Sequence, residues 1–361
     1  MMKICFSYLF STLILLLINV NCSSSQQGTD EGTMPDIVGQ DDPISEEEEM
    51  DEETDDGTSF ATVVDEYGQL SVEGNKMVDK NGDPIQLRGM SFFWSQWIGK
   101  YYTNETVQWL RDDWHCTAVR AALAVEYDGY LANPEVEKQK IMTVVDAAIE
   151  YGLYVIIDWH DHEAENHLEE SVAFFSEMAQ KYGSYPNIIY EPYNEPLAVS
   201  WRNVLKPYHE AVIAEIRKYD PDNLIICGTP NWSQDVEDVI VAKIDDPNVM
   251  YTLHYYAATH KQELRDKALV ALNNNIPIFV TEYGVTQASG DESIDGPEAE
   301  IWWNFLDEHK ISYLNWSIAD KEELSAALKP GASTTGGWSM EDLTTSGTMV
   351  RNEIRKKNKA Y

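Results

Sequence analysis

The feature that most constrains this chain is a regular alternation of short apolar runs with longer helix-like segments from Tyr67 onward. Strands that alternate with helices pair in parallel, because each helix carries the chain back across the sheet. The eight apolar runs cover 85–88, 118–123, 154–158, 187–190, 224–227, 249–253, 278–281 and 312–315. The helix-like segments between and after them include 135–151, 171–182, 204–219, 262–274 and 347–357.

Eight such units in about 290 residues predict a (β/α)8 TIM barrel. An open doubly wound sheet usually has fewer strands and often a glycine-rich first turn, and the chain contains neither G-x-G-x-x-G nor a P-loop. Two short apolar stretches, 70–72 and 77–78, precede the first run and are followed by an Asn-Gly-Asp-Pro turn at 81–84. They predict a small N-terminal hairpin that caps the bottom of the barrel.

The charge balance excludes several classes of partner. The chain has 62 Asp and Glu against 26 Lys and Arg, a net charge of −36. Such a surface repels nucleic-acid phosphates and anionic lipid headgroups, whereas a neutral polysaccharide meets no such repulsion. The 11 Trp and 20 Tyr provide flat rings of the kind that stack on sugars, although aromatic residues also fill cores.

Residues 1–22 have the layout of a secretory signal, with Lys3, an apolar run at 13–18 and no acid. The run is shorter than the roughly 20 residues that cross a bilayer. We therefore expect cleavage and a secreted, extracellular protein. Cys22, followed by three serines, resembles the lipidated cysteine of bacterial lipoproteins, while 19–21 depart from the usual small residues. Simple secretion and a lipid anchor at the cell surface both remain open.

Residues 23–66 contain sixteen acids and no Lys or Arg, so they predict a disordered acidic linker. Either this segment is a spacer or it has no role. Without it and Lys3, 46 acidic and 25 basic residues remain, a net charge of −21 for the predicted domain at 67–361.

Cys116 and Cys227 remain once Cys5 and Cys22 are assigned to the N-terminal segment. An exported protein would permit a disulfide between them. Each lies in or beside an apolar run, however, which favours two separate buried thiols.

Polar or aromatic residues follow most of the predicted strands. In a parallel barrel the carboxyl ends of the strands meet at one face, where catalytic residues gather. We therefore expect these side chains to share one site. They are Arg120, Asp158, Trp159, His160, Tyr193, Asn194, Glu195, His254, Tyr256, Glu282, Asn315 and Trp316.

Two of these residues, Glu195 and Glu282, end the fourth and seventh strands. Hydrolysis of an acetal needs one carboxylic acid to protonate the leaving oxygen and one carboxylate to attack the anomeric carbon. The pair therefore indicates a glycosidase. The mechanism is retaining if the two carboxyl groups lie about 5 Å apart, a distance that the sequence does not give.

Six motifs in order resemble bacterial glycoside hydrolase family 5 cellulases, retaining clan A enzymes with endo-1,4-β-glucanase activity. Asn-Glu-Pro at 194–196 resembles the acid/base motif of the clan, and Thr-Glu-Tyr-Gly at 281–284 resembles its nucleophile strand. The resemblance extends from Leu70 to the end of the chain. The other motifs are Asp-Trp-His at 158–160, Leu-His-Tyr-Tyr at 253–256, Asn-Trp-Ser at 315–317, and the stretch from Lys-Glu-Glu at 321–323 to Gly-Gly-Trp at 336–338.

The resemblance implies that Glu195 is the acid/base and Glu282 the nucleophile. It implies that Asn194 binds the 2-hydroxyl of the sugar being cleaved, and that Arg120 and Tyr256 keep Glu282 ionised and oriented. It implies a monomer that needs neither metal nor other cofactor and acts on β-1,4-glucan and cello-oligosaccharides.

The resemblance also implies substrate contacts along a cleft. His254 would lie beside the acid/base, His160 would contact the same sugar, and Trp316 would form the platform of the cleavage subsite. The outer contacts would be Trp97 toward the non-reducing end, for which Trp94 is an alternative, Trp232 on the leaving-group side, and Lys321 and Glu323 on hydroxyls beyond the cleaved ring.

Three alternatives remain at this stage. His160, His162, Glu163, Glu165 and His167 have the residue types of a metal-dependent barrel hydrolase, although such barrels place His-x-His after the first strand. We expect His162 and His167 to be loop residues. A sugar-binding module without catalysis would not need both glutamates. The same mechanism on mannan, xyloglucan or mixed-linkage glucan is the nearest alternative.

Overall fold

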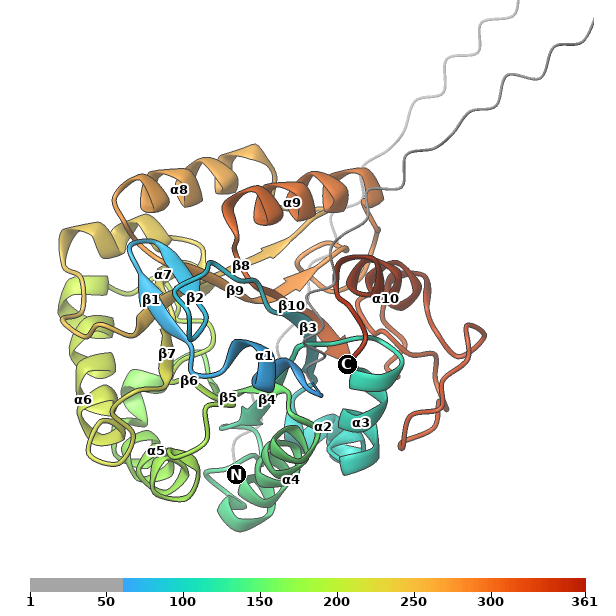
Figure 1. The fold of residues 1–361 in the computed structure, drawn as a ribbon, viewed down its shortest axis with the longest axis horizontal. Coiled ribbons are helices and arrows are strands. Elements are labelled where there is room, and N and C mark those ends of the chain that lie inside the picture. The colour runs from blue at the N-terminus through green and yellow to red at the C-terminus, as the bar shows by residue number, and fades with distance from the viewer. Residues whose placement is uncertain (1–60) are drawn as a thin grey trace, which may run out of the picture. The chain divides into compact units, whose positions relative to one another are not determined.

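The computed structural model describes residues 61–361, which form a closed barrel of eight parallel strands (Figure 1). The strands pair in chain order, and β10 closes the barrel on β3. This confirms the predicted TIM barrel. The strands are β3 (Arg88–Phe92), β4 (Ala118–Ala124), β5 (Tyr154–His160), β6 (Ile188–Glu191), β7 (Leu224–Cys227), β8 (Val249–Tyr256), β9 (Ile278–Gly284) and β10 (Tyr313–Ile318).

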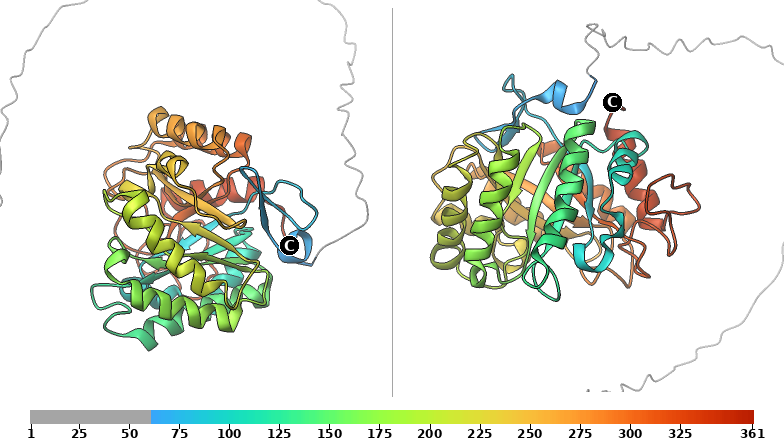
Figure 2. Two further views of the ribbon diagram at one scale, coloured as in Figure 1. Left: turned by 90° about the vertical axis from the view of Figure 1, so that its left-hand side faces the viewer. Right: turned by 90° about the horizontal axis from the view of Figure 1, so that it is seen from below.

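Helices surround the barrel on its outer side (Figure 2). The long helices are α3 (Asn104–Asp112), α4 (Pro134–Tyr151), α5 (Leu168–Tyr182), α6 (Lys206–Ile216), α8 (Gln262–Asn273), α9 (Gly296–His309) and α10 (Thr345–Lys357). The short ones are α1 (Val63–Tyr67), α2 (Ser95–Ile98), α7 (Pro230–Ser233), the 3-10 turns η1 (Gly99–Tyr101), η2 (Ala164–Asn166) and η4 (Val236–Val241), and the π-helical turn η3 (Trp201–Leu205). None of the helices among residues 61–361 has the length and apolar composition needed to span a bilayer.

The barrel strands are buried on both faces, which is why they appear in the sequence as continuous apolar runs. Every residue of β4, β5 and β9 is buried, for example. The first barrel strand does not have its predicted boundaries. The predicted run covers 85–88, whereas β3 begins at Arg88, where that run ends. It contains Gly89, whose hydrogen faces the Ala118 carbonyl so closely that a Cβ would lie 1.8 Å from that oxygen. The tight approach of β3 to β4 therefore requires glycine.

The hairpin of β1 (Ser71–Glu73) and β2 (Lys76–Val78) lies at the amino ends of the strands, as predicted. The Val72 amide donates to Asn248 Oδ1 (3.3 Å), and Asn248 directly precedes β8. In the same way Gln69 donates to Asn223 Oδ1 (2.9 Å), just before β7. The hairpin therefore covers the end of the barrel opposite to the carboxyl ends of the strands.

The folded part of the chain begins earlier than the predicted boundary at Tyr67. Helix α1 starts at Val63, which is buried, and Thr62 caps it by accepting from the Asp65 amide. Thr62 also packs against Gly152 at the end of α4. The last residues of the predicted linker 23–66 are thus part of the domain. The signal at 1–22, Cys22 and the linker up to residue 60 lie outside the described residues.

Two further predictions concern helices and cysteines. Helices α3 and α9 were not among the predicted helix-like segments. Asp295 begins α9 by accepting from the Glu298 amide, and Thr103 caps α3 in the same manner. Cys116 and Cys227 are both buried and free, which confirms the expectation of two separate thiols.

Candidate active site

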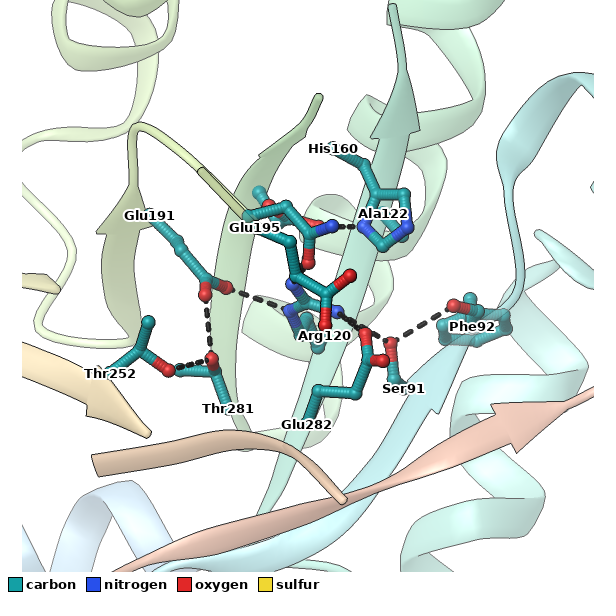
Figure 3. Close-up of polar contacts among 12 residues, drawn as sticks. Ser91, Phe92, Arg120, Ala122, His160, Glu191, Glu195, Thr252, Thr281 and Glu282 are labelled. Atoms are coloured by element: carbon teal, nitrogen blue, oxygen red, sulfur yellow. Dashed lines mark hydrogen bonds and ion pairs between the residues drawn. The ribbon is translucent and has the colours of Figure 1, made fainter. Parts of the chain in front are cut away.

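The parallel arrangement brings the predicted polar residues together at the carboxyl ends of the strands (Figure 3). Arg120 comes from β4, His160 from β5, His254 and Tyr256 from β8, Glu282 from β9 and Trp316 from β10, while Asn194 and Glu195 follow β6. All of them line one cleft or contact its lining residues.

Glu282 lies deep in this site between two fixed partners. Its Oε2 is 3.2 Å from Arg120 Nη1, and its Oε1 accepts a 2.7 Å hydrogen bond from the Tyr256 hydroxyl. The side chain is 6% exposed. A cation and a hydrogen-bond donor so placed fix the direction of the carboxylate. Arg120 and Tyr256 thus contact the predicted nucleophile directly.

Arg120 is fully buried and lies at the centre of a network of acids. Its Nε donates to Glu191 Oε2 (2.7 Å), and its Nη2 lies 3.0 Å from Asp158 Oδ2. The same nitrogen donates to Asn194 Oδ1 (2.7 Å), which places that amide beside the catalytic pair. Burial acts to lower the pKa of Arg120, but the surrounding carboxylates raise it above its usual value.

The two inner carboxyl groups, Asp158 and Glu191, differ from ordinary acids. Burial raises the pKa of each to about 7, although Arg120 works in the opposite direction. Glu191 also accepts a 2.6 Å hydrogen bond from the Thr281 hydroxyl. Sequence reasoning did not select Glu191 as a site residue. An acid at the end of an apolar strand, four residues before Glu195, was the available signal.

Glu195 lies nearer to the surface, with 16% of its side chain exposed, and contacts two histidines. His254 Nδ1 is 3.0 Å from Oε1, and His162 Nε2 is 3.4 Å from Oε2. Burial acts to raise the pKa of Glu195, but these two contacts outweigh it and lower the pKa below its usual value. The pKa values of His162 and His254 are raised by the same contacts, although burial opposes the rise. The ionisation of Glu195 is therefore coupled to that of the two histidines.

The distance between the two glutamates is the measure that the sequence did not give. One carboxylate oxygen of Glu195 and one of Glu282 lie within 4.8 Å of each other, with a nitrogen of His254 inside the same limit. Retaining glycosidases hold their carboxyl groups about 5–5.5 Å apart, and inverting enzymes about 6.5–9.5 Å. The spacing is that of a retaining pair.

The floor of the cleft consists of stacked rings. Trp316 and His160 lie parallel, with ring centroids 4.9 Å apart and an angle of 3° between the planes. His160 Nδ1 is 2.7 Å from Asp158 Oδ2, and burial lowers the pKa of His160 well below its usual value. A neutral His160 that donates through Nδ1 presents Nε2 as an acceptor. Trp94 packs edge-on against His160 at 4.3 Å, so it supports this floor, whereas Trp97 is 56% exposed at the rim.

The cleft extends to both sides of the glutamates. One cavity of about 290 Å³ is lined by the two glutamates together with Trp232, Gln234 and His260. A second of about 230 Å³ is lined by Trp97, Phe93, Lys321 and Glu323 among others. Lys321 and Glu323 form an ion pair with each other, and Lys321 lies 5.5 Å above the Phe93 ring. The predicted outer contacts thus line two cavities that share the two glutamates.

The residues of the metal-hydrolase alternative have separate partners. His160 contacts Asp158, His167 contacts Asp161, and Glu165 accepts from the Tyr193 hydroxyl. Within residues 61–361 the one group of acids and histidines with converging ligand atoms is Glu195, His254 and Glu282, which is the glycosidase pair with its histidine. His162 and His167 lie in the loop between β5 and α5, as predicted, and the His162 imidazole also contacts Glu195.

Known endoglucanases are similar to this chain in sequence. Endoglucanase A of Evansella cellulosilytica is 48% identical over 280 residues, which are 76% of this chain and 57% of that protein. Endoglucanase N of Pectobacterium atrosepticum is 46% identical over 299 residues, 82% of this chain and 67% of that protein. The chain spans about three fifths of the length of the first of these relatives.

Solved structures agree with the sequence comparison. A structure from Cytophaga hutchinsonii has 57% identity and a TM-score of 0.82, covering 82% of this chain and 97% of that one. The catalytic domain of the Thermobifida fusca endoglucanase Cel5A has 34% identity and a TM-score of 0.79, covering 81% and 99%, and a variant of that domain has been solved with cellotetraose. The family model for cellulase, glycosyl hydrolase family 5, matches residues 78–322. With this match, and with the paired glutamates at the mouth of its barrel, the chain belongs to the family 5 glycosyl hydrolases.

Proposed function

We propose that this protein hydrolyses internal β-1,4-glucosidic bonds of cellulose and related β-glucans with retention of anomeric configuration. The observation that carries the proposal is the approach of Glu195 and Glu282 to within 4.8 Å at the centre of an open cleft. The endoglucanase names of its relatives and the cellotetraose complex of the Thermobifida fusca domain support the choice of glucan.

The reaction takes two displacements. An oxygen of Glu282 attacks the anomeric carbon, the bonding pair of the breaking C–O bond moves to the leaving oxygen, and that oxygen takes a proton from Glu195. Water then gives a proton to Glu195 and attacks the same carbon, which releases Glu282. Two inversions give net retention. The reaction needs no metal or other cofactor.

The residues around the pair have supporting roles. Asn194, whose amide oxygen accepts from Arg120, is left with its amide nitrogen as a donor for the sugar 2-hydroxyl. His160 offers an acceptor to the same sugar, and Trp316 is the platform beneath it. His254 is held by the Thr281 hydroxyl at 2.9 Å and orients Glu195.

Internal cleavage follows from binding on both sides of the bond. Trp97, Lys321 and Glu323 line one cavity, which we assign to the non-reducing side of the bond, and Trp232, 44% exposed, lines the other, which we assign to the leaving-group side. Flat exposed indoles stack on glucosyl rings without requiring charge, which suits a neutral chain and an acidic protein. A glucan that passes through an open cleft is cut within its length.

The roles of the two glutamates are tested by changing each to glutamine and varying the leaving group. Glu282→Gln should lower kcat by about 10⁴-fold or more on every substrate, since it removes the nucleophile. Glu195→Gln should lower kcat by about 10²–10⁴-fold on cello-oligosaccharides. It should leave the first step on an activated aryl cellobioside nearly intact, because that leaving group needs no proton. Glu300→Gln on the exposed face of α9 is the control. Equal loss on both substrates in the Glu195 variant would refute the assignment.

Stereochemistry and bond choice have their own assay. Proton NMR of the first product from cellopentaose should show the β-anomer, and carboxymethylcellulose should lose viscosity before much reducing sugar appears. An initial α-anomer contradicts the nucleophile, and release of sugar from chain ends without viscosity loss contradicts internal cleavage. Mannan, xyloglucan and mixed-linkage glucan are the alternative substrates, and a panel of these polymers at equal mass ranks them by kcat/KM.

We also propose that the protein is exported and acts as a monomer. The sequence of residues 1–22 supports export, and Cys22 with its serines supports lipid attachment that would leave the acidic segment as a spacer. Mass spectrometry of the mature N-terminus and detergent partition test attachment. A cytoplasmic precursor that keeps residues 1–22 contradicts export, and light scattering that gives a dimer contradicts the monomer.

A further inference from the structure

The His162 imidazole contacts Glu195, yet the two-glutamate mechanism gives it no role. It follows β5 by two residues and points its Nε2 toward Glu195 Oε2 at 3.4 Å. Oε1 of the same carboxylate is occupied by His254. Each oxygen of the predicted acid/base thus has its own imidazole partner.

The position of His162 is set by contacts from several elements. The Tyr193 hydroxyl, from the segment after β6, donates to the His162 carbonyl at 2.8 Å. The Glu195 amide donates to the Asp161 carbonyl at 3.3 Å, which ties the two segments together beside the cleft. Trp94 packs edge-on against the His162 ring with centroids 5.6 Å apart. The imidazole and the carboxylate are therefore held at a defined separation.

The two histidines beside Glu195 differ in burial. His254 is 1% exposed, whereas the His162 side chain is 38% exposed and can exchange a proton with solvent. Burial acts to lower the pKa of His162, but Glu195 after β6, Glu282 on β9 and Asp161 beside it outweigh burial and raise it. His254 on β8 contacts the other oxygen of Glu195. His160 is close as well and is neutral. The surroundings therefore favour a proton on His162.

We propose that His162 is a positioning residue that shares a proton with Glu195 and thereby sets the position of the basic limb of the pH profile. This inference rests on the proposed role of Glu195 as acid/base. One proton is shared between His162 Nε2 and Glu195 Oε2. When it lies on Glu195 it passes to the glycosidic oxygen as the C–O bond breaks, and His162 is left neutral. The water of the second displacement returns a proton to Glu195, which shares it with His162 again.

The consequence for pH follows from counting protons. A pair of sites that share one proton loses it at a higher pH than either site alone, because the proton has two places to bind. Only the form with the proton on Glu195 is productive, so sharing lowers the maximum rate by the same factor as it moves the basic limb. Removing the second site should therefore move the basic limb of the pH profile down and raise the maximum.

The experiment compares wild type with His162→Gln, whose amide keeps a donor for Glu195 without titrating. In kcat/KM for cellotetraose against pH, the basic limb of the variant should lie about 0.5–1 pH unit lower. Its maximum should rise by the corresponding factor, about 3–10-fold, because no proton is then held on the second site. With an aryl cellobioside whose departure needs no proton, the basic limbs of the two proteins should coincide. His167→Gln is the matched control, because His167 pairs with Asp161, and its profile should match wild type.

Two outcomes overturn the proposal. A uniform loss of activity at every pH with an unmoved basic limb means that His162 has only a structural role. A limb that moves to higher pH means that His162 merely depresses the pKa of Glu195. Failure of the underlying function is separate, because it appears in Glu195→Gln as equal loss on both classes of substrate whatever His162 does.

Discussion

The surroundings of Glu282 and of Glu195 differ in one respect that matches their proposed roles. Glu282 is held by Arg120, which is charged at every relevant pH, and by the Tyr256 hydroxyl. Glu195 is held by two histidines, which gain and lose protons near neutrality. A nucleophile must be ionised before each attack, whereas an acid/base must change its protonation twice in each cycle. Fixed partners suit the first task and titrating partners the second.

The difference extends below the surface. Beneath Glu282, Arg120 also binds Asp158 and Glu191, whose pKa values burial raises to about 7. The Arg120 guanidinium thus faces three acids. Near neutrality, protons on Asp158 and Glu191 remove part of the negative charge that one cation does not balance. Glu195 has no direct contact with Arg120 among the described residues, and it reaches the network only through His254 and the Thr281 hydroxyl. The nucleophile is therefore coupled to the Arg120 network more directly than the acid/base is.

Breaking the Arg120 network should have the largest effect on stability. Arg120→Met leaves buried acids without their cation, which costs about 3–5 kcal/mol of unfolding free energy. Glu282 should also lose its fixed charge partner, so kcat in the protein that remains folded should fall by about 10²-fold or more. Urea denaturation and steady-state kinetics measure the two effects.

Arg351→Met is the control for Arg120→Met. Arg351 pairs with Asp113 at 2.7 Å near the surface, and its loss should cost about 1 kcal/mol or less. If Arg120→Met were as stable as Arg351→Met, the network would not couple the nucleophile to the barrel. The loss of stability in Arg120→Met should also be smaller at pH 5.5 than at pH 8, since protons on Asp158 and Glu191 partly replace the missing cation.

A second prediction compares His254, which contacts Glu195, with His209, a buried histidine that has no acidic partner. His209 on α6 is buried like His254, but its Nε2 contacts the Gly228 carbonyl at 3.0 Å. Burial lowers the pKa of His209 to about 4, whereas the Glu195 contact raises that of His254. In the unfolded chain His209 binds a proton below about pH 6.5, whereas in the folded chain it binds one only below about pH 4. Stability should therefore fall by up to about 3 kcal/mol over this range.

His209→Gln keeps a donor for the Gly228 carbonyl and removes the titration. Urea midpoints at pH 7 and pH 4.5 should show a smaller acid loss in the variant than in wild type, while activity near neutrality stays close to wild type. An unchanged acid loss would mean that burial without a carboxylate does not control the proton, and the contrast with His254 would fail.

Much of this site was predictable because the barrel converts sequence order into proximity. Once the eight runs were identified as parallel strands, the residues after each run had to meet at one face. This reasoning assigned four residues to one site before any distance between them was known: Glu195, Glu282, Arg120 and Tyr256. It worked best for strands buried on both faces, such as β7, whose predicted and observed bounds coincide at Leu224–Cys227.

The remaining features depend on contacts between residues that are far apart in the sequence, and the hydrophobic periodicity does not reveal such contacts. β3 was displaced by several residues, because Gly89 and Ser91 interrupt its apolar run while the tight approach to β4 requires glycine at 89. His162 looked like an ordinary loop residue, since its partner lies in a segment that only the closed barrel brings near. The distance between the two carboxylates is likewise a property of β6 and β9 in register. Sequence order fixes which residues meet, and side-chain packing decides which atoms touch.

The smallest effect tests the second fixed partner of Glu282. Tyr256→Phe removes only the hydroxyl that donates to Oε1 at 2.7 Å, and a hydrogen bond to a charged group contributes about 1.5–3 kcal/mol. We expect kcat to fall by about 10–100-fold with little change in the urea midpoint, because the ring stays packed beside Trp316 and Phe93. Tyr255→Phe is the matched control on the same strand, since its hydroxyl has no hydrogen-bond partner among residues 61–361 and should be dispensable for activity.

The pH profile separates Tyr256 from His162. Burial raises the pKa of Tyr256 well above its usual value, so Tyr256 stays protonated over the working range. Tyr256→Phe should therefore lower kcat/KM by the same factor at every pH without moving the basic limb. That limb should move in His162→Gln instead. If Tyr256→Phe moved the basic limb as His162→Gln should, the two glutamates would share one proton network and the contrast between fixed and titrating partners would be lost.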